Sequence, residues 1–300
     1  MENKLLLEVK NLIWKHNTAV LLDIPSLKLT KGFATALIGE NGAGKSNLLK
    51  ALAGINLAYE GDIDYNFGAK YEDKIKKDIG YTSINNYFLH SWNLNRFAKA
   101  NSLMYDNFSK EDFFKLCEEF GLTDRKKPIF RYSDGMRTKT ALASVFARDT
   151  RLLLLDEPAS NLDPIMRDKL CSMMRDYLHK GNGEKTILFS THNISDMESV
   201  TDYAIIMAGC KIVEEGFVED LKEKYVVIKG ELDEASSVKP YLIDYIESSY
   251  GYEGLCLSED LEKLTGYDVA VELPTLNQIS MALMRQHTDI SAPREEDLKL

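Results

Sequence analysis

The sequence contains few cysteines and no long apolar run, and each shortage excludes a class of protein. Its four cysteines, Cys117, Cys171, Cys210 and Cys256, lie far apart and form no CxxC pair. This usage is typical of a reducing compartment and argues against both a disulfide scaffold and a cysteine-based zinc site. No stretch approaches the roughly 20 consecutive apolar residues that a membrane-spanning helix requires. We therefore expect no such helix.

Basic charge is also in short supply. The 37 lysines and arginines are outnumbered by 47 acidic residues, which gives a formal net charge of −10. Proteins that bind nucleic acid neutralise its phosphates with clustered basic residues, so no nucleic-acid partner is expected. The start of the chain, MENKLLLEVKNL, lacks the basic segment and longer apolar stretch of a signal peptide. A cytoplasmic location is therefore expected.

The sequence does contain an alternation of strand-like and helix-like segments. Phe33–Ile38 is a short apolar run, and residues 47–53 have a helical pattern with leucines on one face. Leu152–Leu155 and Ile187–Phe189 are continuous apolar runs, which are typical of buried parallel strands. Between these two, Asp163-Pro164 predicts the start of a helix. The pattern predicts a three-layer α/β core, with Ile187–Phe189 as its last strand.

Two regions differ from this alternating pattern. One is rich in aromatic residues and helix formers, and it predicts a helical subdomain within the core. The other, after residue 220, combines two strand-like segments (225–228 and 268–273) with an amphipathic helix marked by Leu276, and it predicts a small α+β extension. The expected divisions are a main domain at 1–220, its helical subdomain at about 84–147, the extension at 221–290 and a tail at 291–300.

Residues 39–46 read GENGAGKS and fit the pattern GxxxxGK[ST] between a strand and a helix. Glycines allow backbone N–H groups to surround phosphate oxygens, and the helix N-terminus adds partial positive charge. Lys45 is expected to contact the β- and γ-phosphates, and Ser46 to ligate Mg²⁺. The expected nucleotide contacts are Gly39, Asn41, Gly42, Ala43, Gly44, Lys45, Ser46 and Asn47. This loop alone indicates a P-loop NTPase, which includes kinases, GTPases and recombinases.

A pair of carboxylates follows the apolar run Leu152–Leu155. Asp156, at the end of this expected strand, can hold Mg²⁺ directly or through water. Glu157 follows at once and can polarise an attacking water if it lies within hydrogen-bonding reach. The alternative is that the two acids only cap the strand.

Three further motifs resemble those of ABC ATPases in sequence and in order, and the resemblance covers about residues 4–218. The segment YSDGM at 132–136 resembles the family signature LSGGQ, and Ser133 lies 23 positions before Asp156. Ser133 and Gly135 match the family positions that contact the γ-phosphate held by the partner subunit. Asp134 departs from the pattern, and we expect its side chain to point aside.

The same resemblance assigns two segments near the expected carboxylates. Residues 160–163 (SNLD) resemble the D-loop of the family, which runs along the dimer interface. His192, in STHN, resembles the switch histidine. The resemblance implies that one nitrogen of His192 approaches the γ-phosphate and that the other meets Glu157 or the D-loop.

Two family positions are less clearly matched. The ring that stacks on adenine is either His16 or Trp14, and alignment with the family pattern favours His16. The glutamine of the Q-loop is missing after Ile79-Gly80-Tyr81, where the chain reads TSINN. Asn85 or Asn86 can approach the metal in its place, through a bridging water because the side chain is shorter.

The resemblance implies an ATP-binding and ATP-hydrolysing subunit with Mg²⁺, which pairs head-to-tail with a second ATP-binding subunit, identical or different. A separate transmembrane permease is the expected partner, and it places the chain on the inner face of the cell membrane. Tyr87, Phe88, Leu89 and Trp92 either receive that permease or belong to the core of the helical subdomain. The signature and the extension are most like bacterial exporters of drugs, peptides or antibiotics. The alternatives are a soluble ABC-family ATPase not coupled to transport and an inactive scaffold.

Overall fold

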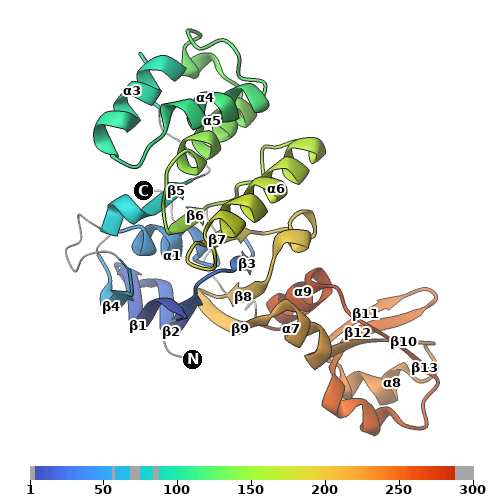
Figure 1. The fold of residues 1–300 in the computed structure, drawn as a ribbon. Coiled ribbons are helices and arrows are strands. Elements are labelled where there is room, and N and C mark those ends of the chain that lie inside the picture. Colours follow the sequence, from blue (N-terminus) through green and yellow to red (C-terminus); the bar gives the residue numbers. More distant parts are fainter. Residues whose placement is uncertain (1–3, 56–57, 68–74, 84–87, 288–300) are drawn as a thin grey trace.

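The computed structural model describes residues 4–55, 58–67, 75–83 and 88–287. A six-stranded sheet lies at its centre, with the strand order β5-β6-β7-β3-β8-β9 (Figure 1). Strands β5, β6, β7, β3 and β8 are parallel, and β9 is antiparallel to β8. The strands are β3 (Ala34–Gly39), β5 (Ile79–Thr82), β6 (Leu152–Leu155), β7 (Thr186–Thr191), β8 (Tyr203–Ala208) and β9 (Lys211–Phe217).

The three central strands β3, β6 and β7 are buried at every residue, as their continuous apolar runs predict. The expectation that the run at 187–189 forms the last strand of the core is wrong. Strands β8 and β9 follow it and extend the sheet by two. Their signal is present in the sequence, because residues 204–208 form another buried apolar run.

Each face of the central sheet packs on a separate apolar cluster. One face is covered by helix α1 (Lys45–Leu52) and by a smaller antiparallel sheet of order β2-β1-β4. The strands of that sheet are β1 (Leu5–His16), β2 (Ala19–Thr30) and β4 (Glu60–Tyr65). The other face packs on α6 (Pro164–Lys180) and on part of α5. This is the predicted layered α/β core of a P-loop NTPase.

Three helices form a unit beyond the β5 edge of the sheet, at the top of Figure 1. They are α3 (Leu94–Met104), α4 (Lys110–Glu119) and α5 (Asp134–Phe146). The buried guanidinium of Arg148 joins this unit to the sheet. It donates to the carbonyl oxygens of Lys77 (2.9 Å) and Ile79 (3.1 Å), and its carbon lies 3.6 Å from the centre of the Tyr105 ring. These helices lie within the region 84–147 in which a helical subdomain was predicted.

The segment after β9 forms a second sheet of order β11-β12-β10-β13 with a small apolar cluster of its own. The predicted strands at 225–228 and 268–273 are present as β10 and β13, whereas β11 and β12 were not predicted. The elements are α7 (Val218–Lys224), β10 (Tyr225–Gly230), α8 (Ala235–Val238), β11 (Asp244–Ser248), β12 (Gly251–Leu257), β13 (Val269–Glu272) and α9 (Leu276–His287).

Helices α7 and α9 connect this extension to the main core (Figure 1). Leu276, Ile279 and Leu283 of α9 belong to the same buried cluster as α6 and the central sheet. The predicted division at residue 220 falls within α7, and the predicted tail at 291–300 lies outside the described residues. Among the residues described, no helix has both the length and the apolarity needed to cross a bilayer.

Candidate functional site

The phosphate-binding loop connects β3 to α1, as the sequence pattern requires. Gly44 precedes α1 with φ at +94°, and a Cβ there would lie 3.1 Å from the carbonyl oxygen of Leu21. Both features favour glycine at this position. The Asn47 amide, expected at the nucleotide, donates to the same Leu21 oxygen at 3.4 Å. Strand β2 therefore packs against the loop at the N-terminus of α1 and supports it.

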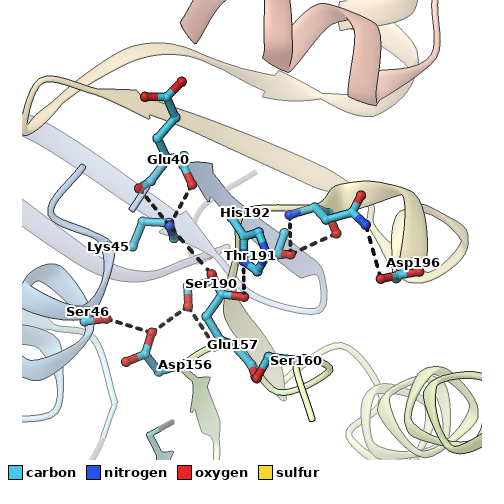
Figure 2. A network of polar contacts seen from close by, with 12 residues as sticks. Glu40, Lys45, Ser46, Asp156, Glu157, Ser160, Ser190, Thr191, His192 and Asp196 are labelled. Atoms are coloured by element: carbon cyan, nitrogen blue, oxygen red, sulfur yellow. Dashed lines mark hydrogen bonds and ion pairs between the residues drawn. The ribbon is translucent and has the colours of Figure 1, made fainter. Parts of the chain in front are cut away.

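Lys45 is 5% exposed and lies inside the loop. Its ammonium donates to the carbonyl oxygens of Gly39 (2.6 Å) and Glu40 (3.0 Å), as Figure 2 shows. It also lies 3.6 Å from Oε1 of Glu157, an ion-pair distance that is too long for a hydrogen bond. Burial lowers the pKa of Lys45, while the nearby carboxylates of Glu157 and Asp156 oppose this shift. The charged form is thus supported by the two acids at the end of β6.

Asp156 follows β6 and is 4% exposed. Its Oδ1 accepts hydrogen bonds from the hydroxyls of Ser46 (3.0 Å) and Ser190 (2.7 Å). Both hydroxyls meet the same oxygen, and neither engages Oδ2. The structure therefore brings two of the predicted metal ligands, Ser46 and Asp156, into direct contact.

Glu157 connects Lys45 to His192. Its Oε2 lies 2.9 Å from Nδ1 of His192, while its Oε1 faces Lys45 (Figure 2). The expected approach of His192 to Glu157 is therefore present. The backbone of Glu157 has φ at +47°, a left-handed conformation that is uncommon for residues other than glycine. Its N–H donates to the Ser190 hydroxyl at 2.9 Å.

The signature segment lies at the start of α5. The Ser133 hydroxyl caps this helix by accepting from the Met136 N–H at 3.3 Å, and Ser133 is exposed. Asp134 points aside as expected, since its Oδ1 lies 3.3 Å from Nη1 of Arg137. Gly135 approaches the D-loop closely, because a Cβ there would lie 2.7 Å from the carbonyl oxygen of Asn161. The signature and D-loop of one chain are thus packed against each other.

Arg167, which was not predicted as part of the site, links the D-loop to the segment after His192. Nε of Arg167 donates to the carbonyl oxygen of Leu162 at 3.0 Å, and its Nη1 donates to Asp196 at 2.6 Å. No local sequence signal marks Arg167 for this role, because Asp196 lies 29 positions away.

The structure describes the two candidates for stacking on adenine but not the substitutes for the Q-loop glutamine. His16 is exposed at the end of β1, whereas Trp14 is partly buried against the apolar cluster around α1. Of the two candidates for stacking on adenine, His16 is therefore the accessible one. Asn85 and Asn86, the predicted substitutes for the Q-loop glutamine, lie outside the described residues, as does Tyr87.

The other three residues of the proposed permease contact are divided between core and surface. Phe88 and Trp92 pack against Phe97 of α3, with ring centres 5.2 and 5.3 Å apart respectively. Leu89 is 61% exposed. Next to it along the chain, His90 stacks on Phe130 at 4.1 Å. The core interpretation therefore holds for Phe88 and Trp92, while a permease contact at the exposed Leu89 stays a prediction.

The donor set fits Mg-ATP. Magnesium in nucleotide sites is commonly held by one or two protein oxygens together with phosphate oxygens. Here the Ser46 hydroxyl and Asp156 are already in contact, with Oδ2 of Asp156 engaged by neither serine. The loop glycines, the N-terminus of α1 and the Lys45 ammonium supply complementary groups for phosphate. The chemistry of these residues is therefore that of a nucleotide and magnesium site.

Known proteins with similar sequences identify the family of this chain. The family model described as ABC transporter matches residues 22–160. An uncharacterized ABC transporter ATP-binding protein of Nostoc is 30% identical over 284 residues, which cover 91% of this chain and 82% of that protein. The tungstate uptake system ATP-binding protein TupC of Peptoclostridium acidaminophilum is 30% identical, with 70% of this chain and 98% of that protein covered.

The fold leads to the same family. The solved structure of an ATP-binding subunit of an ABC transporter matches with a TM-score of 0.62 and 25% identity, and the match covers 72% of this chain and 92% of that one. In this chain the phosphate loop lies between β3 and α1, the paired carboxylates follow β6, and His192 follows β7. The chain belongs to the family of ATP-binding subunits of ABC transporters.

Proposed function

We propose that this chain hydrolyses ATP at a site completed by a second ATP-binding subunit, and that this hydrolysis drives an exporter. The observation that carries the proposal is the continuous chain of contacts from Lys45 through Glu157 to His192. Lys45 and the loop glycines would bind phosphate, and Asp156 with Ser46 would hold Mg²⁺, which would offset the negative charge of the phosphates. Glu157 accepts a proton from water, and His192 holds the Glu157 carboxylate in place.

The need for a second subunit follows from where the signature lies. Ser133 and Gly135 begin α5 in the helical unit, while Lys45 begins α1 on the opposite side of the central sheet (Figure 1). Ser133 is exposed, so another chain can reach its hydroxyl and the first N–H groups of α5. Two chains placed head-to-tail would each complete the other's site, and nucleotide would then hold the pair closed.

A Glu157→Gln variant tests both parts of this proposal. The amide keeps the size of the side chain but cannot accept the proton, so the hydrolysis rate falls by about 100-fold or more. ATP binding remains, and the variant accumulates as a dimer in Mg-ATP, measured by light scattering behind a sizing column. Glu184→Gln, which removes an exposed ion pair with Lys31, is the control and leaves hydrolysis unchanged. A Glu157→Gln variant that stays monomeric, alone and with its companion subunits, contradicts the shared site.

We propose that the partner driven by this hydrolysis is a transmembrane permease. Binding to it would place the chain on the inner face of the membrane. Support comes from apolar side chains that are exposed in α3, Leu103 (77%) and Met104 (63%), and in the segment before it, Leu89 (61%). Leu89→Asp abolishes co-purification with the permease from detergent extracts. Leu232→Asp, which changes an exposed leucine of the extension (44%), leaves co-purification intact. If the Leu89→Asp variant still co-purified with the permease, the contact would not depend on Leu89 and would lie elsewhere.

The proposed direction is export. The YSDGM signature and the extension after residue 220 support it. The alignment with the tungstate uptake protein spans 98% of that protein in 213 residues, which leaves it almost nothing to match the extension. ATP-dependent accumulation of cargo inside inverted vesicles that contain the complex tests this direction. Accumulation in right-side-out vesicles instead would show uptake.

A further inference from the structure

Ser190 begins the STHN segment that contains His192, but the sequence pattern assigned it no role of its own. It lies near the end of β7 and is completely buried, between the strands that carry the phosphate loop and the carboxylates. The parallel register pairs Leu155 of β6 with Phe189 of β7. Asp156 and Ser190 each follow one member of that pair, so they lie side by side at this end of the two strands.

One hydroxyl group serves both carboxylate residues. Oγ of Ser190 donates to Oδ1 of Asp156 at 2.7 Å and accepts from the backbone N–H of Glu157 at 2.9 Å (Figure 2). Both bonds are buried, where a polar group without a partner is unfavourable. The adjacent hydroxyl of Thr191 does not duplicate this role, because it bonds to the backbone of Asn193.

The two bonds act on different parts of the site. The bond to Oδ1 of Asp156 works together with the Ser46 hydroxyl, so one carboxylate oxygen is engaged twice and Oδ2 remains for a cation. The bond from the Glu157 N–H holds a residue whose φ of +47° is uncommon for a side-chain-bearing residue. That backbone conformation directs the Glu157 carboxylate between Lys45 and His192.

We propose that Ser190 is the positioning residue of this site, which orients Asp156 toward the metal and fixes the backbone that presents Glu157. The proposal rests on the ATPase function proposed above. Residues that orient a metal ligand from behind typically change metal affinity or activity by about 10- to 100-fold when removed. Ser190 is therefore expected to affect metal affinity and the chemical step more than nucleotide affinity.

The test uses three substitutions in the full chain. Ser190→Ala removes the hydroxyl, Ser190→Cys keeps the side-chain size with a weak donor, and Ser190→Thr keeps the hydroxyl. Ser280→Ala is the matched control, because Ser280 is 1% exposed and its hydroxyl donates within its own helix to Asn277. This control shows what the loss of a buried serine hydroxyl does far from the carboxylates.

The first measurement is Mn²⁺ binding to protein loaded with a non-hydrolysable ATP analogue, followed by electron paramagnetic resonance. Ser190→Ala and Ser190→Cys weaken Mn²⁺ binding about 10-fold, while analogue binding in EDTA changes less than about 2-fold. Ser190→Thr restores most of the affinity, and Ser280→Ala matches the unmodified chain. Unchanged Mn²⁺ affinity in both Ser190→Ala and Ser190→Cys overturns the proposal.

The second measurement separates this proposal from the function on which it rests. In steady-state hydrolysis, Ser190→Ala lowers kcat at saturating Mg²⁺ and raises the Mg²⁺ concentration for half-maximal rate, with little change in KM for ATP. If kcat falls equally in Ser190→Thr and Ser190→Ala, the proposed role of the hydroxyl is overturned. Failure of the unmodified chain to bind the analogue instead refutes the proposed ATPase function, whatever the variants do.

Discussion

The phosphate-loop side and the signature side of the proposed site differ in how much of their geometry one chain sets. Lys45, Asp156 and Glu157 are 5%, 4% and 7% exposed, and each is held by contacts to other elements. Ser133 and Asp134 are exposed, and their bonds stay within four residues. One side is preorganised by the fold, whereas the other presents a helix start to solvent. This contrast is expected if the second side functions against another molecule.

The largest effect is expected from Lys45→Ala on the preorganised side. The variant loses a buried positive charge at the phosphates, so hydrolysis falls at least about 100-fold, and nucleotide binding weakens with it. Hydrolysis assays and titration with a fluorescent ATP analogue measure the two losses. The control is Lys50→Ala, in the same helix α1, which keeps both properties. Normal nucleotide affinity in Lys45→Ala would mean that the loop does not bind phosphate.

A smaller and different effect is expected from Ser133→Ala on the exposed side. Loss of the hydroxyl removes the cap of α5 and a group for the partner's nucleotide, so hydrolysis falls about 10-fold and stability by about 1 kcal/mol. Nucleotide affinity of the monomer is unchanged. The matched control is Ser109→Ala, which removes the cap of α4 in the same unit, with the Asp112 N–H at 3.1 Å. It loses similar stability, measured by urea unfolding, and keeps hydrolysis.

The result for the monomer decides whether the contrast between the two sides holds. If Ser133→Ala weakens nucleotide binding by a monomer as much as it lowers hydrolysis, both sides belong to one site within one chain. If Ser109→Ala lowered hydrolysis equally, the effect of Ser133→Ala would come from helix stability alone, and the Ser133 hydroxyl would have no role at the partner's nucleotide.

The smallest effect is expected from Asp134→Asn. The Asp134 side chain is 79% exposed and pairs with Arg137 at 3.3 Å, away from Ser133. Exposed ion pairs contribute little, so the free energy of unfolding changes by about 0.5 kcal/mol or less and hydrolysis by less than about 2-fold. Thermal unfolding and steady-state hydrolysis check both values. A rise of 10-fold in hydrolysis would show that this acid opposes the phosphate of the partner's nucleotide.

The sequence predicted those parts of the site that depend on residues close together along the chain. The phosphate loop from Gly39 to Ser46 and the pair Asp156-Glu157 carry their chemistry in local patterns, and local strand and helix periodicity fixes their elements. The α/β core followed from the same periodicity, whereas the helical unit was predicted from a composition rich in aromatic residues and helix formers. Strand β8 was missed although its apolar run is as clear as that of β7.

Contacts between distant segments could not be predicted in the same way. Ser190 meets Asp156 because of the register between β6 and β7. Arg167 of α6 meets Asp196, which lies 29 positions later and beyond β7. The close approach of Gly135 to Asn161 depends on how the helical unit is placed beside the sheet. The hairpin β11–β12 was missed because its residues carry weak alternation, with exposed positions through most of β11.

Helix α9 has a consequence for any shortened form of the chain. Leu276 and Ile279 are completely buried, and the N–H of Leu276 donates to Glu198, which also pairs with Lys222 of α7. A chain ended after β9 would leave the apolar surface beneath α9 open to water and Glu198 without these two bonds. Such surfaces promote self-association. The last described helix thus shields apolar surface of the central α/β core from water. A chain shortened to end after β9 would need another group to cover that surface.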